Sequence, residues 1–158
     1  LLVGAAGQGA WTAALDSPGE YTQLTVSDNS NPARARILRS VESGHTNISQ
    51  VDLFARSLGV EADPLRLDSQ AKYALLAAGK GDLYLRLLSS SRPDYKEKIW
   101  DQAAGSIILE EAGGMITDLD GRRLDFTHGR SLEENRGILA SNRLLHEAAL
   151  EALNEVGA

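Results

Sequence analysis

The 158-residue sequence contains no cysteine, one methionine, two tryptophans and two phenylalanines. The absence of cysteine excludes disulfide bonds and thiolate metal sites, and it is compatible with a reducing compartment. No apolar run approaches the roughly 18 residues that a membrane-spanning helix needs. We therefore expect no membrane role and a cytoplasmic location.

Positive charge is also scarce, because 16 Lys and Arg residues face 22 Asp and Glu residues, which gives a net charge of -6. Proteins that bind nucleic acid polymers neutralise phosphates with Lys and Arg, so this balance argues against such a partner. Any bound phosphate has to be met locally, by a few cations, helix N-termini or metal ions. The length and the 42% hydrophobic content fit one globular domain.

The beginning of the sequence, LLVGAAGQGAW, has no Met, no basic segment and no long apolar segment. It reads neither as a natural N-terminus nor as a signal peptide, so we expect the sequence to be part of something longer. The glycine spacing in GAAGQG fits neither a dinucleotide-binding nor a P-loop fingerprint. We interpret this stretch as the tight backbone of a strand or hairpin.

Hydrophobic periodicity predicts alternating strands and helices. The expected strands are 24–26, 36–41, 64–68, 82–88, 115–117 and 137–140, and the expected helices are 48–58, 70–78, 101–112 and 142–154. This alternation predicts a layered α/β domain with a mixed, largely parallel sheet flanked by helices. In such domains ligands gather where the carboxyl ends of strands meet helix N-termini.

The segment LDSQAKY places Ser69 at an expected N-cap and Lys72 in the first helical turn, where the helix dipole disfavours a cation. One interpretation is an anion held by backbone N–H groups, the Ser69 hydroxyl and the Lys72 ammonium. The other is a solvated lysine on a well-capped helix. This segment alone leaves both open.

Arg86 interrupts the apolar strand of GDLYLRLL. A buried guanidinium needs a partner, and its planar fork suits a phosphate or a carboxylate. The alternative is an edge strand from which the guanidinium reaches water.

The segment KIWDQAAG places Asp101 at the N-cap or in the first turn of a helix, between Trp100 and three small residues. A capping role explains the carboxylate. However, the small residues at 103–105 also leave space in which a metal ion, a phosphate or another backbone could approach. Of the three histidines, His45 and His128 fall in expected loops, and we expect His146 at the surface of the last helix.

Together, LDSQAKY, DLYLRL and YKEKIWDQAAGSIILEEAGG resemble the C-terminal domain of the lithium-sensitive, magnesium-dependent phosphatases of the inositol monophosphatase superfamily. The general signature is Trp100–Gly105 followed by Glu111–Gly114, and the first two segments point to the 3'(2'),5'-bisphosphate nucleotidase branch. The resemblance implies the C-terminal half of the family fold over residues 1–158. It also implies removal of the 3'-phosphate of 3'-phosphoadenosine 5'-phosphate to give AMP and phosphate.

The resemblance implies that Asp101 is a catalytic Mg²⁺ ligand that also meets the substrate, and that four residues contact the nucleotide and its phosphates: His45, Ser69, Lys72 and Arg86. The family's other metal carboxylates belong to an N-terminal domain with an Asp-Pro-Ile/Leu-Asp-Gly-Thr segment, which this sequence lacks. That half is expected in cis or as a separate chain.

Hydrolysis of a phosphate monoester by this route needs two or more Mg²⁺ ions, and one aspartate holds such ions weakly. We therefore expect the 158 residues alone to be inactive. The alternatives are a phosphatase of another small phosphate, such as an inositol phosphate or fructose bisphosphate, and a non-catalytic nucleotide-binding module.

Overall fold

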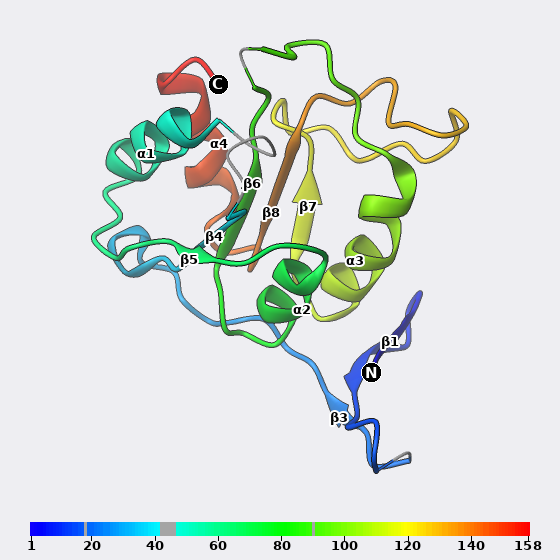
Figure 1. The fold of residues 1–158 in the computed structure, drawn as a ribbon. Coiled ribbons are helices and arrows are strands. Elements are labelled where there is room, and N and C mark those ends of the chain that lie inside the picture. The colour runs from blue at the N-terminus through cyan, green and yellow to red at the C-terminus, as the bar shows by residue number, and fades with distance from the viewer. Residues whose placement is uncertain (18, 42–46, 90) are drawn as a thin grey trace.

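A computed structural model of the chain describes residues 1–17, 19–41, 47–89 and 91–158. Its main element is a five-stranded sheet with the order β5-β4-β6-β8-β7 (Figure 1). The strands are β4 (Ile37–Arg39), β5 (Leu65–Arg66), β6 (Leu83–Arg86), β7 (Met115–Thr117) and β8 (Ile138–Ser141). β4 runs parallel to β5 and β6, and β8 runs antiparallel to β6 and β7. The sheet is therefore mixed, as the sequence predicts, but only two of its four strand pairs are parallel, fewer than the expected largely parallel sheet would have.

Helices cover both faces of this sheet (Figure 1). They are α1 (Ile48–Ser57), α2 (Ala71–Ala77), α3 (Ile99–Glu111) and α4 (His146–Glu155). The period-two alternation of strand side chains assigns the faces. Leu83 and Leu85 of β6 pack in one cluster with Phe54 of α1, whereas Tyr84 packs in another with Tyr73 of α2. The alternating apolar pattern thus becomes two cores, one beneath α1 and α4 and one beneath α2 and α3.

A separate three-stranded antiparallel sheet precedes the main sheet and lies against α3 (Figure 1). It consists of β1 (Leu2–Ala5), β2 (Gly9–Thr12) and β3 (Thr22–Gln23). The β1–β2 turn is anchored by the Glu111 carboxylate, which accepts hydrogen bonds from Gly7 N and Gly9 N, both at 2.8 Å. The expected hairpin at the glycine-rich start is confirmed.

Three expected strands, 36–41, 64–68 and 82–88, are shorter in the structure, and two other expected elements differ more. Residues 24–26 are not a strand, although Leu24 N donates to Ala10 O at 2.8 Å just beyond the end of β3. The last helix begins at His146 rather than Asn142, because Arg143 has a φ of 73° and the Asn142 side chain caps the turn by accepting from Leu145 N at 3.2 Å. Local polar bonding therefore delays the helix by one turn.

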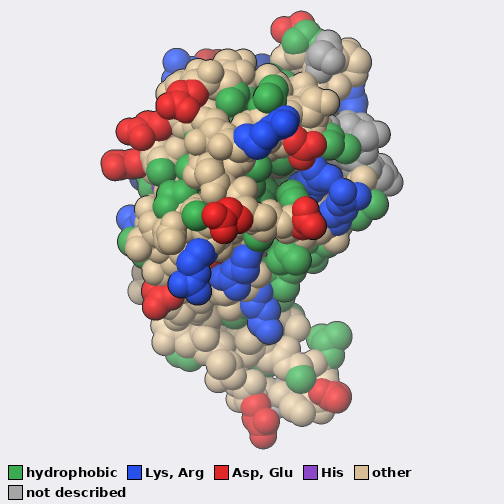
Figure 2. All heavy atoms as spheres, turned by 90° about the vertical axis from the view of Figure 1, so that its left-hand side faces the viewer, with side chains coloured by type: hydrophobic (Ala, Val, Ile, Leu, Met, Phe, Trp, Pro, Cys, Tyr) green, Lys and Arg blue, Asp and Glu red, His purple; other side chains and the backbone are tan. Residues whose placement is uncertain are grey.

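Charged side chains of both signs lie among one another on the face that Figure 2 shows. The net negative charge is therefore not concentrated there in one patch. None of the helices in the described ranges has the length and apolar character needed to cross a bilayer.

Candidate functional site

The chain gathers most of its expected site residues at one edge of the main sheet. β4 lies between β5 and β6 and is parallel to both, so the carboxyl ends of these three strands meet at the same edge. Arg86 ends β6, and Ser69 follows shortly after β5. The starts of α2 and α3 are joined there, because Gln70 Nε2 donates to Trp100 O at 3.1 Å. Asp101 is thereby brought to the edge that carries Ser69 and Arg86.

Asp101 is the third residue of α3 and lies in its first turn. The N-cap is Lys98, so the first-turn expectation is confirmed and the N-cap alternative is wrong. The helix dipole stabilises a negative charge at this position. The side chain is partly exposed, and no hydrogen bond or ion pair engages its carboxylate within the part of the chain that the structure describes. Its oxygens are therefore available to a cation.

The space that a side chain at Gly105 would take is occupied. A Cβ at this position would lie 2.2 Å from Cδ2 and 2.5 Å from Cγ of the Tyr73 ring. The glycine is needed because α2 packs its tyrosine directly onto the backbone of α3. Space beside the small residues remains, as expected: Ala103 and Ala104 are exposed, and a hollow of about 330 Å³ is lined by Ala104 and Gly105 together with residues of α2.

Ser69 and Lys72 lie on either side of the α2 start. Ser69 directly precedes the N-cap residue, Gln70, and has a φ of 65°. Its Oγ accepts a hydrogen bond from Ala71 N at 3.3 Å. Ser69 is thus not the N-cap itself, although its hydroxyl bonds the first turn. Its side chain is exposed and can reach a ligand.

Lys72 is 3% exposed, so the interpretation as a solvated lysine is wrong. Its Nζ donates to Leu67 O at 3.3 Å and lies 5.1 Å from the centre of the Tyr84 ring. Burial lowers the pKa of Lys72; Asp68 opposes this effect and Arg86 adds to it. The ammonium is held in a cation–π and backbone contact beneath the edge.

Arg86 lies on a central strand, since β6 is flanked by β4 and β8, so the edge-strand alternative is wrong. Its Nε lies 2.6 Å from Glu97 Oε1. Burial is the largest effect and opposes the charge of the guanidinium, but Glu97, Tyr84 and Tyr95 together outweigh it, so the pKa of Arg86 is raised. The partner that a buried guanidinium requires is supplied, at least at Nε, by the chain itself.

The sequence interpretation missed a buried polar network below these residues. Glu97 is 3% exposed, and its Oε2 accepts from Gln102 Nε2 at 2.9 Å. Gln102 Oε1 in turn accepts from the Tyr73 hydroxyl at 2.5 Å. Helical spacing could have identified Gln102, because it shares the buried face of α3 with Gly105 and Leu109. Nothing could have identified Glu97, which stands between two lysines in a polar stretch and reads as a solvated charge.

Tyr84 lies among the charged groups of the edge. Lys72 lies over its ring, and Arg86 hydrogen-bonds its side chain. Burial raises the pKa of Tyr84 to about 12; Arg86 opposes this rise, whereas Glu97 and Asp101 add to it. The Asp101 carboxylate is therefore close enough to Tyr84 to affect its ionisation. The phenol stays protonated at neutral pH.

The structure tests the expected locations of two of the three histidines. His45 lies outside the described residues. His128 lies in a loop, as expected, with Nε2 3.2 Å from Asp125 Oδ2. His146 is 1% exposed, so its expected surface position is wrong. Its ring bonds the hydroxyls of Thr117 and Ser141 at 3.0 and 2.8 Å, which allow the imidazole to enter the core.

The carboxylate of Asp101 is available to a metal ion at this edge. Oxygen ligands of this kind suit Mg²⁺. Both oxygens of Glu97 are already engaged by Arg86 and Gln102. Among the residues that the structure describes, no group of three or more His, Cys, Asp or Glu side chains could enclose a metal.

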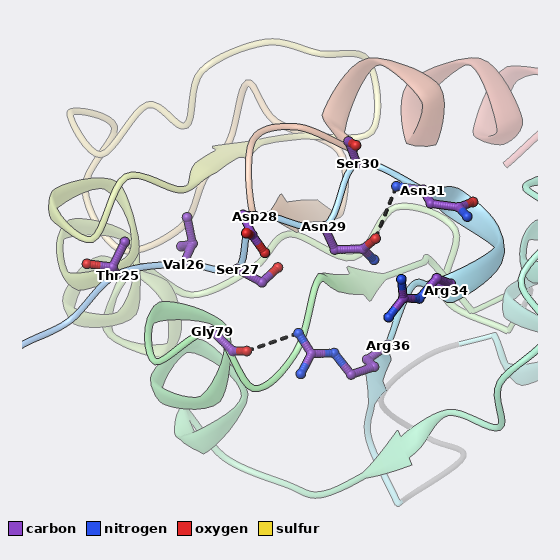
Figure 3. Close-up of a pocket in the computed structure, with 10 residues that line it drawn as sticks. All are labelled: Thr25, Val26, Ser27, Asp28, Asn29, Ser30, Asn31, Arg34, Arg36 and Gly79. Carbon is purple, nitrogen blue, oxygen red and sulfur yellow. Dashed lines mark hydrogen bonds between the residues drawn. The ribbon is translucent and has the colours of Figure 1, made fainter.

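A further hollow lies away from these residues (Figure 3). It has a volume of about 880 Å³ and is open to solvent. Its wall consists of residues 25–31 with Arg34, Arg36 and Gly79. Arg36 immediately precedes β4, so the hollow adjoins the amino end of this strand and not the edge that carries Asp101. We assign the candidate site by chemistry rather than by volume.

Three comparisons relate the chain to known proteins. A model of the inositol monophosphatase family matches residues 1–158. The chain is 39% identical over 155 residues to a 3'(2'),5'-bisphosphate nucleotidase of Dictyostelium discoideum. The aligned region covers 98% of this chain and 46% of that protein. It is 44% identical over 133 residues to a protein of the same name from Oryza sativa, and this aligned region covers 84% of the chain and 36% of that protein. The chain thus spans less than half the length of these curated relatives.

The solved structure of an inositol monophosphatase from Anabaena matches with a TM-score of 0.66 and 28% identity, over 96% of this chain and 53% of that one. This match confirms the expected α/β fold with a mixed sheet between helices.

Proposed function

Because this chain belongs to the inositol monophosphatase family, we propose that it is part of a Mg²⁺-dependent phosphatase that removes the 3'-phosphate of 3'-phosphoadenosine 5'-phosphate. The observation that carries the proposal is the meeting of Ser69, Arg86 and Asp101 at one edge of the sheet, in a chain whose curated relatives are named bisphosphate nucleotidases. Sensitivity to lithium and a cytoplasmic location belong to the same proposal and rest on the resemblance alone.

In this proposal the residues of the chain divide into two groups. Asp101 holds one Mg²⁺ ion with its free carboxylate, at a helix start that favours negative charge. Arg86 and Ser69 bind phosphate oxygens, and Lys72 adds positive potential from just below the edge. When bound, Mg²⁺ ions supply a hydroxide nucleophile and neutralise the leaving oxygen. His45 contacts the nucleotide as well.

Nucleotide recognition can be tested by titrating the chain with 3'-phosphoadenosine 5'-phosphate, AMP and inositol 1-phosphate in a calorimeter, with Mg²⁺ present. We expect the bisphosphate to bind most tightly, because it offers two phosphates and a base. Arg86→Ala should weaken this binding by about tenfold, the usual loss for one hydrogen bond to a charged group. Arg122→Ala is the matched control, since this arginine is 69% exposed. Equal or tighter binding of inositol phosphate would contradict nucleotide recognition.

Catalysis by residues 1–158 alone is a second test. We propose that the remaining metal carboxylates and the groups that activate the attacking water come from residues outside this sequence, because one aspartate holds Mg²⁺ weakly. The chain incubated with Mg²⁺ and 3'-phosphoadenosine 5'-phosphate should therefore release no phosphate above the rate without protein. Robust phosphate release would show that the 158 residues build a complete catalytic site.

A further inference from the structure

Glu97 occupies a position that connects the elements of the candidate site. We infer that Glu97 is a positioning residue, whose buried carboxylate orients Arg86 for phosphate binding and braces the first turn of α3 that carries Asp101. This inference rests on the proposed function and deepens it. Glu97 itself touches neither substrate nor metal in this account.

The two carboxylate oxygens of Glu97 have different partners. Oε1 lies 2.6 Å from Arg86 Nε, and Oε2 accepts from Gln102 Nε2 at 2.9 Å. The carboxylate is 3% exposed and lies between β6 and α3. The contact with Arg86 is an ion pair rather than a hydrogen bond, since Arg86 Nε has no hydrogen-bond partner among the described residues, whereas the contact with Gln102 is a hydrogen bond to a charged acceptor. One side chain therefore joins the strand that ends in Arg86 to the helix that begins beside Asp101.

The connection continues to α2. Gln102, which directly follows Asp101, accepts from the Tyr73 hydroxyl at 2.5 Å. The Tyr73 ring meets the Tyr84 ring edge to face at 5.2 Å between centres. This series of contacts joins α2 through Tyr73, α3 through Gln102 and β6 through Tyr84 and Arg86. These are the three elements that carry Lys72, Asp101 and Arg86.

The backbone around Glu97 is also held. Leu132 N donates to Glu97 O at 2.9 Å, and the next residue, Lys98, donates from Nζ to Ser131 Oγ at 2.8 Å. These backbone contacts and the Gln102 bond to Oε2 restrict the positions that the Glu97 carboxylate can take. Since a guanidinium has five N–H donors, an ion pair that holds its Nε side toward Glu97, together with the bond to Tyr84, leaves further donors for a phosphate.

The test replaces Glu97 with glutamine, which keeps the size of the side chain and removes its charge. In Glu97→Gln we expect the ¹H–¹⁵N signal of Arg86 Nε–Hε to broaden or exchange faster, and binding of 3'-phosphoadenosine 5'-phosphate to weaken by about tenfold. The signal is identified by its loss in Arg86→Ala. Glu133→Gln, the same change at an exposed residue, should alter neither measurement.

A double-mutant comparison separates positioning from general stabilisation. If Glu97 acts through Arg86, Glu97→Gln should cause little further loss of affinity in an Arg86→Ala background. An equal loss in both backgrounds would assign Glu97 a structural role and overturn the inference. An unchanged affinity and an unchanged Arg86 signal in Glu97→Gln would overturn it as well.

Glu97→Gln leaves a guanidinium without its buried counter-charge, so a second variant covers a failure to fold. Gln102→Met keeps the Arg86–Glu97 pair but removes the brace on Oε2 together with the bond from the Tyr73 hydroxyl, and it should weaken binding by about threefold. Unchanged nucleotide affinity in a folded Gln102→Met chain would overturn the inference that Glu97 braces α3. If the wild-type chain fails to bind the nucleotide, the proposed function is wrong, whereas the Arg86 signal still decides whether Glu97 orients the guanidinium.

Discussion

Replacing Gly105 with alanine is expected to lower the free energy of unfolding by about 3 kcal/mol, at the upper end of what overpacking a core usually costs. The new methyl carbon would lie 2.2 Å from the Tyr73 ring. Neither α2 nor α3 can withdraw freely, because the Tyr73 hydroxyl is bonded to Gln102 and the ring lies in the core beneath both helices. The helices must separate or the tyrosine must leave its site.

The sign of this effect is informative, because Gly to Ala inside a helix ordinarily stabilises it by about 1 kcal/mol. Urea unfolding of the chain measures the difference. Ala104→Ser adds one atom at the neighbouring exposed position and should stay within about 0.5 kcal/mol of wild type. The cost of Gly105→Ala should shrink when Tyr73 is also changed to leucine, since the two residues are in direct contact. A Gly105→Ala chain more stable than wild type would contradict the packing.

The second large effect concerns the stability of the domain in acid and depends on His146. Burial, with a smaller contribution from the charge of Arg143, lowers the pKa of this imidazole to about 4. Thr117 Oγ1 donates to Asp118 O at 2.7 Å, so it accepts from Nε2 of His146, and Nδ1 accepts from the Ser141 hydroxyl. The site is therefore built for the neutral ring.

The pH dependence follows from the difference between the folded and unfolded pKa values. Above pH 6.5 the ring is neutral in both states, and its contribution to stability is fully present. Between pH 6.5 and 4 the unfolded chain binds a proton that the folded chain refuses, so stability falls as the pH falls. We expect this group alone to remove about 2 kcal/mol between pH 7 and pH 5, and about 3 kcal/mol once the pH is below 4.

Urea unfolding at several pH values, for wild type and His146→Gln, isolates this contribution from that of the carboxylates. The variant should be less stable at pH 7 but should lose less stability on acidification. His128→Gln is the matched control, because His128 lies in a surface loop beside Asp125. Parallel pH profiles for wild type and His146→Gln would show that His146 titrates alike in both states.

The candidate site combines an exposed layer with a buried one. Ser69 is exposed and Asp101 is partly exposed, whereas the Glu97, Gln102 and Tyr73 side chains lie below them and bond one another. Buried polar groups that satisfy one another in this way favour one arrangement of the surrounding elements. The positions of the exposed residues Ser69 and Asp101 thus depend on buried residues that no ligand needs to contact.

The sequence by itself determined the elements whose signals are local. Hydrophobic periodicity and the glycines at 113 and 114 located α3 and its end, and the short run Met115–Thr117 was predicted with the bounds that β7 has. The alternation of strands and helices was sufficient for the fold class. Asp101 and Arg86 could also be recognised from their immediate neighbours in the sequence. Asp101 is a carboxylate at a helix start, and Arg86 is an arginine in an apolar strand.

Only the tertiary structure decided which partner each buried group meets. Gly105 faces Tyr73 from another helix, Arg86 is paired with Glu97 from a polar loop, and His146 is bonded to two hydroxyls on β7 and β8. These partners are 32, 11, 29 and 5 residues away in the sequence, respectively. The physical reason is that periodicity reports which face of an element is buried, whereas the identity of the neighbour depends on how separate elements pack against each other.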